Sequence, residues 1–161
     1  MATFHEELDE SLCEFIGSQH IFFVATAPQE GRISLSPKGM DSLRVFNPRE
    51  VGYLDVTGSG NETAAHVEQN GRLTLMFCSF ERTPLILRLY GKGRILHPRD
   101  TEYEERMEAF DPIAGARQII LLSIESIQKS CGYSIPFYEY QGERDTLKKW
   151  AENKGQEGLP R

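Results

Sequence analysis

Two short stretches of the chain carry residue types that could bind an anion such as phosphate. Arg32–Lys38 has a basic residue at each end and two serines between them, and Thr57–Thr63 reads Thr-Gly-Ser-Gly-Asn-Glu-Thr after an apolar run. Glycines let the backbone approach a ligand, and hydroxyls donate hydrogen bonds. A helix that begins at Asn61 would add free N–H groups and the positive end of its dipole. Together the two stretches predict a phosphate site beside a β-strand wall.

The second stretch is also typical of an ordinary strand-to-helix turn. Gly, Ser and Asn are common turn and cap residues, and Asn61 would then be the N-cap. The segment lacks the spacing of a P-loop and of the dinucleotide-binding fingerprint, so spacing alone favours the turn. Glu62 opposes a phosphate, because a like charge at 4 Å repels it by about 1 kcal/mol in water.

Two basic residues have alternative interpretations. Lys38 is the best cation for a phosphate, although a solvated turn lysine would have the same sequence context. Arg88 lies in the otherwise apolar run Leu85–Tyr90, where an unpaired buried charge would be costly. Arg88 therefore either contacts a ligand or a dimer partner, or forms a salt bridge with an acid on a neighbouring strand. Asp55 is a candidate for that acid, and the salt bridge is the favoured interpretation.

The elements that must position these residues are mostly strands. Short turns connect them, so antiparallel pairing is expected, and six or seven strands with glycine bends predict a small barrel. The strand at 20–27 is nearly all apolar and is expected to be buried on both sides, whereas Gly91 and Gly93 predict a bulge in the strand at 85–96. The expected strands are 20–27, 32–36, 41–46, 51–56, 72–80, 85–96 and 116–125. The expected helices are 3–17, with a capping box of Thr3 and Glu6, then 61–69, 100–110 and 142–154; an aromatic tail begins at 131.

Length, charge and cysteine content limit the possible functions. The 161 residues fit a single domain, 1–161, and a net charge of −6 argues against a broad nucleic-acid-binding surface. No apolar run is long enough to span a membrane, and the N-terminus lacks the pattern of a secretory signal. The three cysteines are far apart, so neither a zinc site nor a disulfide framework is expected. These features predict a cytoplasmic protein that binds neither membranes nor nucleic acid.

Several of these segments, taken in order, resemble the pyridoxamine 5′-phosphate oxidase-like family of FMN-binding split barrels. The resemblance is carried by the Arg-x-x-x-x-Pro-Lys pattern, by a strand that ends in Val-Thr, and by the loop and helix after it. Two later strands, a Ser-Pro-Lys-Gly segment and a Cys-Gly-Tyr-x-x-Pro tail also agree. These pieces are Arg32–Lys38, Val56–Thr57, Gly58–Gln69, Arg72–Phe77, Arg88–Arg94, Ser36–Gly39 and Cys131–Pro136.

The resemblance implies a mainly β (α+β) fold: a six-stranded antiparallel split β-barrel with flanking helices. It also implies a homodimer with FMN at the subunit interface. The FMN-binding residues that it implies are Arg32, Ile33, Ser34, Leu35, Ser36, Pro37, Lys38, Val56, Thr57, Gly58, Ser59, Asn61, Glu62, Thr63 and Arg88.

The chain departs from the oxidase pattern at two points. Asn61, Glu62 and Thr63 stand where the true oxidase has Ser-Arg-Lys, and the glutamine that holds the flavin ring there is absent near Leu85–Ile86. The resemblance therefore implies an FMN-dependent oxidoreductase of unknown substrate rather than a pyridoxamine-phosphate oxidase. No catalytic residue can be assigned from spacing. The alternatives are a non-catalytic protein that carries FMN or another cofactor, including haem or a deazaflavin, and a dimeric scaffold with an empty cleft.

Overall fold

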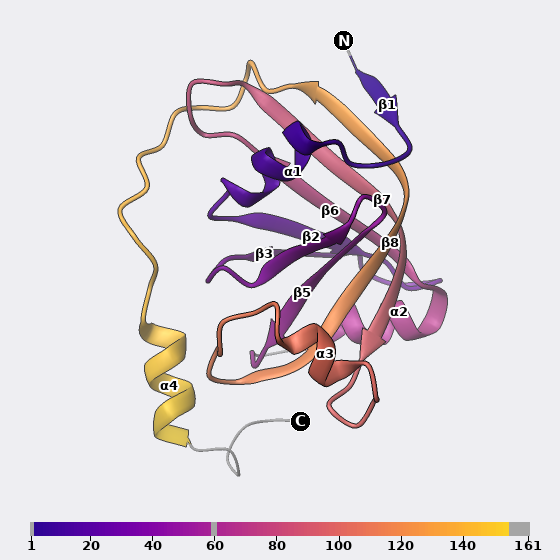
Figure 1. Ribbon diagram of the computed structural model, residues 1–161, viewed down its shortest axis with the longest axis vertical. Helices are drawn as coiled ribbons and strands as arrows, with labels where there is room; N and C mark the ends of the chain where they lie inside the picture. Colours follow the sequence, from indigo (N-terminus) through magenta and orange to yellow (C-terminus); the bar gives the residue numbers. More distant parts are fainter. Residues whose placement is uncertain (1, 59–60, 155–161) are drawn as a thin grey trace.

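The computed structural model of the chain describes residues 2–58 and 61–154 (Figure 1). Eight strands and four helices lie within these ranges. In chain order they are β1 (Thr3–His5), α1 (Glu10–Gly17), β2 (Phe22–Thr26), β3 (Ser34–Lys38), β4 (Leu43–Asn47), β5 (Glu50–Val56), α2 (Glu62–Asn70), β6 (Arg72–Cys78), β7 (Leu85–Leu96), α3 (Tyr103–Met107), β8 (Ala116–Cys131) and α4 (Thr146–Lys154).

All the strands belong to one antiparallel sheet, which curls into an open barrel (Figure 1). The strand order is β3-β2-β6-β7-β8-β5-β4, and β1 pairs with β8 beside this path. The predicted mainly β split-barrel class is confirmed. The strand number differs from the six expected, because seven strands form the main path and β1 adds an eighth at one end of the long β8. The path ends at β3 and β4, so the barrel is open.

One face of the sheet, which we call the inner face, packs into the larger hydrophobic core. Phe22, Val24 and Thr26 of β2 are buried on this face, while Phe23 and Ala25 between them are only half-buried. The prediction that this strand is buried on both sides is therefore wrong. The reason is the antiparallel architecture, in which one face covers the core and the other, here called the outer face, is left open.

A β-bulge divides the pairing of β7 and β8. Tyr90 lies opposite Ser126 but Gly91 lies opposite Ile124, so Glu125 is the extra residue. A Cβ atom on Gly91 would lie 1.9 Å from the carbonyl oxygen of Ser123, which explains why only glycine fits. This confirms the bulge predicted from the glycines. Beyond it, the strands enclose a second, smaller core cluster against which residues of α3 pack.

The N-terminal helix is shorter than predicted. Residues Thr3–His5 form β1, and α1 starts after Asp9, whose carboxylate accepts a hydrogen bond of 2.8 Å from the backbone N–H of Leu12. The predicted capping box of Thr3 and Glu6 is wrong, because Asp9 caps the helix instead.

Other boundaries also differ from the sequence prediction; for example, the strand expected at 32–36 is β3 (Ser34–Lys38), and the helix expected at 142–154 begins only at Thr146. The helix predicted over 100–110 is limited to α3, and the last long strand continues to Cys131. β4 begins only at Leu43, because Met40 and Asp41 adopt left-handed backbone angles, with φ of 62° and 51°. Within residues 2–58 and 61–154, no helix has both the length and the apolar character needed to cross a bilayer.

Candidate functional site

A buried carboxylate lies where β3 and β5 face each other across the open barrel. Asp55 of β5 is only 4% exposed. Its Oδ1 lies 3.6 Å from Nζ of Lys38, and its Oδ2 accepts hydrogen bonds of 3.0 Å from Nη2 of Arg117 and 2.9 Å from Nε2 of Gln118. We call these four residues the Asp55 cluster. Burying a carboxylate costs on the order of several kcal/mol, and only close partners can offset this cost. The pairing with Lys38, Arg117 and Gln118 therefore makes the burial of Asp55 possible.

The Asp55 cluster is tied to the first turn of α2. Nε2 of Gln118 also lies 3.2 Å from Oδ1 of Asn61, the residue before the helix. Asn61 occupies the N-cap position, as expected, but its side chain makes no cap hydrogen bond. Among the described residues, no side chain caps the first N–H groups of α2, so these groups can bind an external acceptor.

Two buried hydroxyls lie near the start of α2. Thr57 follows β5 and precedes the helix in the chain, and Tyr53 of β5 lies close to Thr63 in the first turn of the helix. Oγ1 of Thr57 has no hydrogen-bond partner among the described residues, although the side chain is only 2% exposed. The phenol oxygen of Tyr53 likewise has no well-aligned hydrogen bond within the described ranges. Burial raises the pKa of Tyr53, the charge of Asp55 adds to this, and the Thr63 hydroxyl offsets it only in part. Tyr53 is therefore a neutral phenol that can donate a proton to an acceptor.

The predicted Arg32–Lys38 segment divides between the two faces of the sheet. Ser34, Ser36 and Lys38 lie opposite the buried residues of β2 and so point to the inner face. Ile33 and Leu35 are 75% and 65% exposed, and Arg32 and Pro37 are exposed as well. Lys38 is the residue of this segment that reaches the Asp55 cluster, so it is neither a solvated turn lysine nor a cation without a partner.

The remaining predicted site residues have mixed surroundings. Thr63 is buried in the first turn of α2, Val56 is half-buried, and Gly58, Asn61 and Glu62 are exposed. Ser59, which was also predicted to contact the cofactor, lies outside the described residues.

Arg88 does not join the Asp55 cluster. It lies opposite Met76, which in turn lies opposite the half-buried Phe23, so its side chain is on the outer face. Its Nη1 is 3.3 Å from Oγ of Ser130. The suggested salt bridge to Asp55 is wrong, because residues 55 and 88 lie on opposite faces of the sheet.

Arg117 and Gln118 were missed as site residues at the sequence level. They are the polar start of an otherwise apolar strand, Ala116–Cys131, and a polar pair before a buried run is a signal that could have been used. Within the described ranges, no group of His, Cys, Asp and Glu side chains is arranged to hold a metal ion.

A large cavity of about 820 Å³ adjoins Lys38. Its lining comes from the loop before β2, the turn after β3, the residues after β6, the C-terminal segment and α4. Tyr140 of the C-terminal segment stacks on His20, with ring centroids 3.6 Å apart, and Tyr138 packs against Phe80. Tyr138 and Tyr140 thus contact the barrel, whereas Tyr133 and Phe137 of the same tail are 82% and 75% exposed.

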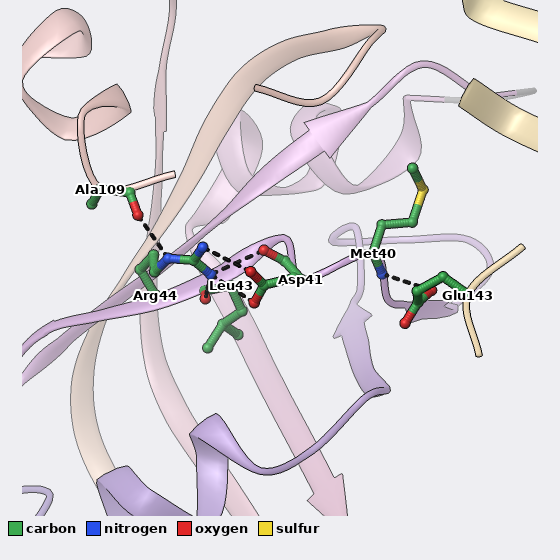
Figure 2. Close-up of polar contacts among 6 residues, drawn as sticks. All are labelled: Met40, Asp41, Leu43, Arg44, Ala109 and Glu143. Atoms are coloured by element: carbon green, nitrogen blue, oxygen red, sulfur yellow. Dashed lines mark hydrogen bonds and ion pairs between the residues drawn. The ribbon is translucent and has the colours of Figure 1, made fainter. Parts of the chain in front are cut away.

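The turn after β3 is strained and is held from two sides. Figure 2 shows the Arg44 guanidinium bound to the carboxylate of Asp41 and to the carbonyl of Ala109, at 2.9 Å and 2.7 Å. On the other side, the backbone N–H of Met40 lies 3.3 Å from Oε2 of Glu143 (Figure 2). These contacts stabilise two residues with positive φ, a conformation that costs about 1 kcal/mol or more for each. They also fix the cavity wall next to Lys38.

Known proteins match both the sequence and the fold. A family model described as pyridoxamine 5′-phosphate oxidase matches residues 8–131. The chain belongs to this family. Its relative in Aspergillus flavus, the pyridoxamine 5′-phosphate oxidase family protein ustO, is 41% identical over 152 residues, covering 91% of this chain and 61% of the relative. The chain thus spans about three fifths of the length of that relative.

Solved structures of this family and of similar proteins share the fold at low identity. HupZ of Group A Streptococcus has a TM-score of 0.60 at 22% identity, covering 74% of this chain and 91% of its own. An FAD binding protein from Mycobacterium smegmatis has a TM-score of 0.54 at 13% identity, covering 78% and 97%. An FMN binding, oxidase-related protein from Nostoc punctiforme has a TM-score of 0.50 at 12% identity, covering 68% and 73%.

Proposed function

We propose that this member of the pyridoxamine 5′-phosphate oxidase family binds FMN and acts as a flavin-dependent oxidoreductase on a small substrate other than pyridoxamine phosphate. The observation that carries the proposal is the buried hydroxyl of Thr57, which has no partner among the described residues, beside a first turn of α2 that no described side chain caps. A buried hydroxyl without a partner is costly in a folded protein unless a ligand completes it. Family membership and fold relatives named for FAD and FMN binding support a flavin as that ligand.

The residues present fit a phosphate group. Thr57, the N–H groups at the start of α2 and the ammonium of Lys38 would hold it. The cavity beside Lys38 offers an apolar volume in which an aromatic ring and a substrate could be kept from water. A bound flavin supplies the redox chemistry, accepting or giving two electrons, and the protein binds and orients it. Tyr53 can donate a hydrogen bond there without ionising.

We also propose that the outer face of the sheet is the interface of a homodimer. Leu35 lies opposite Ala25 on this face, and Phe23, Met76 and Arg88 form the next row. Leu35 is 65% exposed, although a large aliphatic residue on an open sheet is normally covered. In this arrangement Arg88 contacts the second subunit or the cofactor at the interface.

A cytoplasmic location agrees with the free cysteines Cys13, Cys78 and Cys131.

A second candidate function is a non-catalytic protein that carries FMN or another cofactor without turnover. Two observations favour it: Glu62 adds a negative charge to the first turn of α2, and Lys38 is already paired with Asp55. Both weaken the attraction for a phosphate dianion. Anaerobic mixing of the FMN-loaded protein with NADH or NADPH separates the two functions. Bleaching of the flavin band supports the oxidoreductase, and a band that persists with both reductants supports the carrier.

The cofactor assignment is tested by the absorbance of the purified protein after FMN is added and the excess removed by desalting. We expect flavin bands at about one FMN per chain. Thr57→Val keeps the side-chain shape and removes the hydroxyl, so it should weaken FMN binding about tenfold. Thr101→Val, at an exposed site in the loop before α3, is the matched control. A wild-type protein that emerges colourless would contradict the proposal.

A further inference from the structure

We propose that Arg117 of β8 supplies the guanidinium that binds the anionic group of the ligand, in place of a base in the first turn of α2. Asp55 is then a positioning residue that holds this guanidinium in place. The inference rests on the proposed function for the identity of the ligand as a flavin phosphate. It adds a residue that neither the motif pattern nor the sequence spacing assigns to the site.

Backbone pairing places Arg117 near the end of β5, where the Thr57 hydroxyl has no hydrogen-bond partner among the described residues. Val56 lies opposite Ala116, and the backbone N–H of Thr57 donates to the carbonyl of Gly115 at 2.8 Å. Arg117 therefore lies two positions after Gly115, at the point where the register of β5 and β8 shifts. The hydrogen bond between Arg117 and Asp55 fixes the guanidinium before a ligand arrives, so little side-chain entropy remains to be lost on binding.

The charges of the Asp55 cluster leave an excess for an anion. Lys38 and Arg117 contribute two positive charges and Asp55 one negative charge, so the cluster carries a net charge of +1. The Arg117 side chain is 13% exposed and the Asp55 side chain 6%, so water screens this charge weakly. Glu62 is exposed, and solvent therefore screens its repulsion more strongly. The excess charge lies beside the uncapped start of α2, whose dipole has the same sign.

Asp55 positions the arginine and at the same time competes with the ligand for it. Its Oδ2 binds Arg117 and Gln118, and Gln118 continues to Asn61 at the helix start. Replacing the carboxylate by an amide keeps the shape of this connection and removes one negative charge. Asp55→Asn should therefore lower the stability of the ligand-free protein and strengthen anion binding. A residue with a purely structural role would weaken both.

The test compares FMN with riboflavin, which lacks the phosphate, by fluorescence titration of full-length wild-type and variant proteins. We expect Arg117→Ala to weaken FMN binding about 10- to 100-fold and to leave riboflavin binding unchanged. Arg117→Lys should restore part of the loss, because it keeps the charge but not the fork of donors. Arg94→Ala is the control: Arg94 is a half-exposed arginine of β7 that pairs with Glu102, and its loss should not affect either ligand.

A second readout requires no flavin. Inorganic phosphate should raise the melting temperature of the wild-type protein, raise that of Asp55→Asn more steeply, and leave that of Arg117→Ala unchanged. If Arg117→Ala does not fold, the Arg117→Lys and Asp55→Asn proteins carry the test. Equal FMN affinities for the Arg117→Ala and Arg94→Ala proteins would overturn the inference and leave flavin binding intact. Phosphate stabilisation that requires Arg117, in a protein that retains no flavin, would support the inference and contradict the proposed function.

Discussion

Lys38 and Arg88 are basic residues on strands of the same sheet, but they lie on opposite faces and have different surroundings. On the inner face, Lys38 meets the buried carboxylate of Asp55, which two further side chains also bind. On the outer face, Arg88 lies near the hydroxyl of Ser130 among half-exposed apolar residues. Lys38 thus has a counter-charge within one chain, whereas we propose that a second subunit covers the outer face around Arg88. Because side chains alternate between the faces along a strand, a shift of one residue moves a side chain from one face to the other.

The largest effect should come from the bulge that keeps the two faces distinct along β8. Without the extra residue Glu125, the side chains after it would exchange inner and outer positions. Gly91→Ala brings a Cβ to 1.9 Å from the backbone oxygen of Ser123, a clash that no side-chain movement relieves. We expect a loss of more than about 4 kcal/mol in urea unfolding, or no folded protein. Gly17→Ala is the control, because nothing lies within 4 Å of its Cβ.

A Gly91→Ala protein with near-native stability would show that the strands can re-register, and that the separation of the two faces does not depend on this bulge.

The next prediction compares substitutions at two adjacent residues of β6. Leu75 is fully buried on the inner face and Met76 is half-buried on the outer face. Leu75→Ala should cost about 3 kcal/mol, because it leaves a cavity in the core. Met76→Ala should cost about 1 kcal/mol or less in dilute protein, and more at concentrations where the proposed homodimer forms. Urea unfolding at two protein concentrations tests both expectations. Equal, concentration-independent costs would contradict the distinction between the faces.

A charge on the outer face tests the proposed homodimer directly. Leu35→Asp places a carboxylate where the second subunit would bury it, and should weaken dimerisation at least about tenfold. Light scattering at micromolar concentration should then report a monomer for the variant and a dimer for the wild type. The fold should remain intact by circular dichroism, because Leu35 is exposed in the single chain. Thr101→Asp, on the loop before α3, should stay dimeric; an unchanged dimer for Leu35→Asp would place the interface elsewhere.

Sequence periodicity predicted the elements whose own residues determine them. The bounds of β7 were predicted as Leu85–Leu96, because its β-rich pattern ends at a proline and its glycines mark the bulge. The short strand β1 was not predicted, because Thr3–His5 is extended only through its pairing with residues 127–129 of β8. A partner more than a hundred residues away leaves no local signal.

The candidate site follows the same division. Lys38 and Thr57 could be predicted from local sequence, because Lys38 is a cation at the end of one strand and Thr57 is a hydroxyl residue directly after another. Arg117 did not, because its partner Asp55 is 62 positions away in the chain. The face on which Arg88 lies depends on the register of three strands, and register is fixed by the packed core rather than by the arginine itself. The predicted FMN contacts remain predictions.

The smallest effect compares two tyrosine hydroxyls. Tyr90 on the outer face donates a hydrogen bond of 2.8 Å to Gln128, whereas the phenol oxygen of Tyr53 has no well-aligned partner among the described residues. Tyr90→Phe should cost about 1 kcal/mol in urea unfolding, and Tyr53→Phe should change stability by less than about 0.5 kcal/mol. If Tyr53→Phe costs as much as Tyr90→Phe, the Tyr53 hydroxyl is already satisfied by the protein and is not held for a ligand. A Tyr53→Phe protein of unchanged stability but weaker FMN binding would mean that the inner face keeps this hydroxyl for the ligand, while the outer face uses its own for folding.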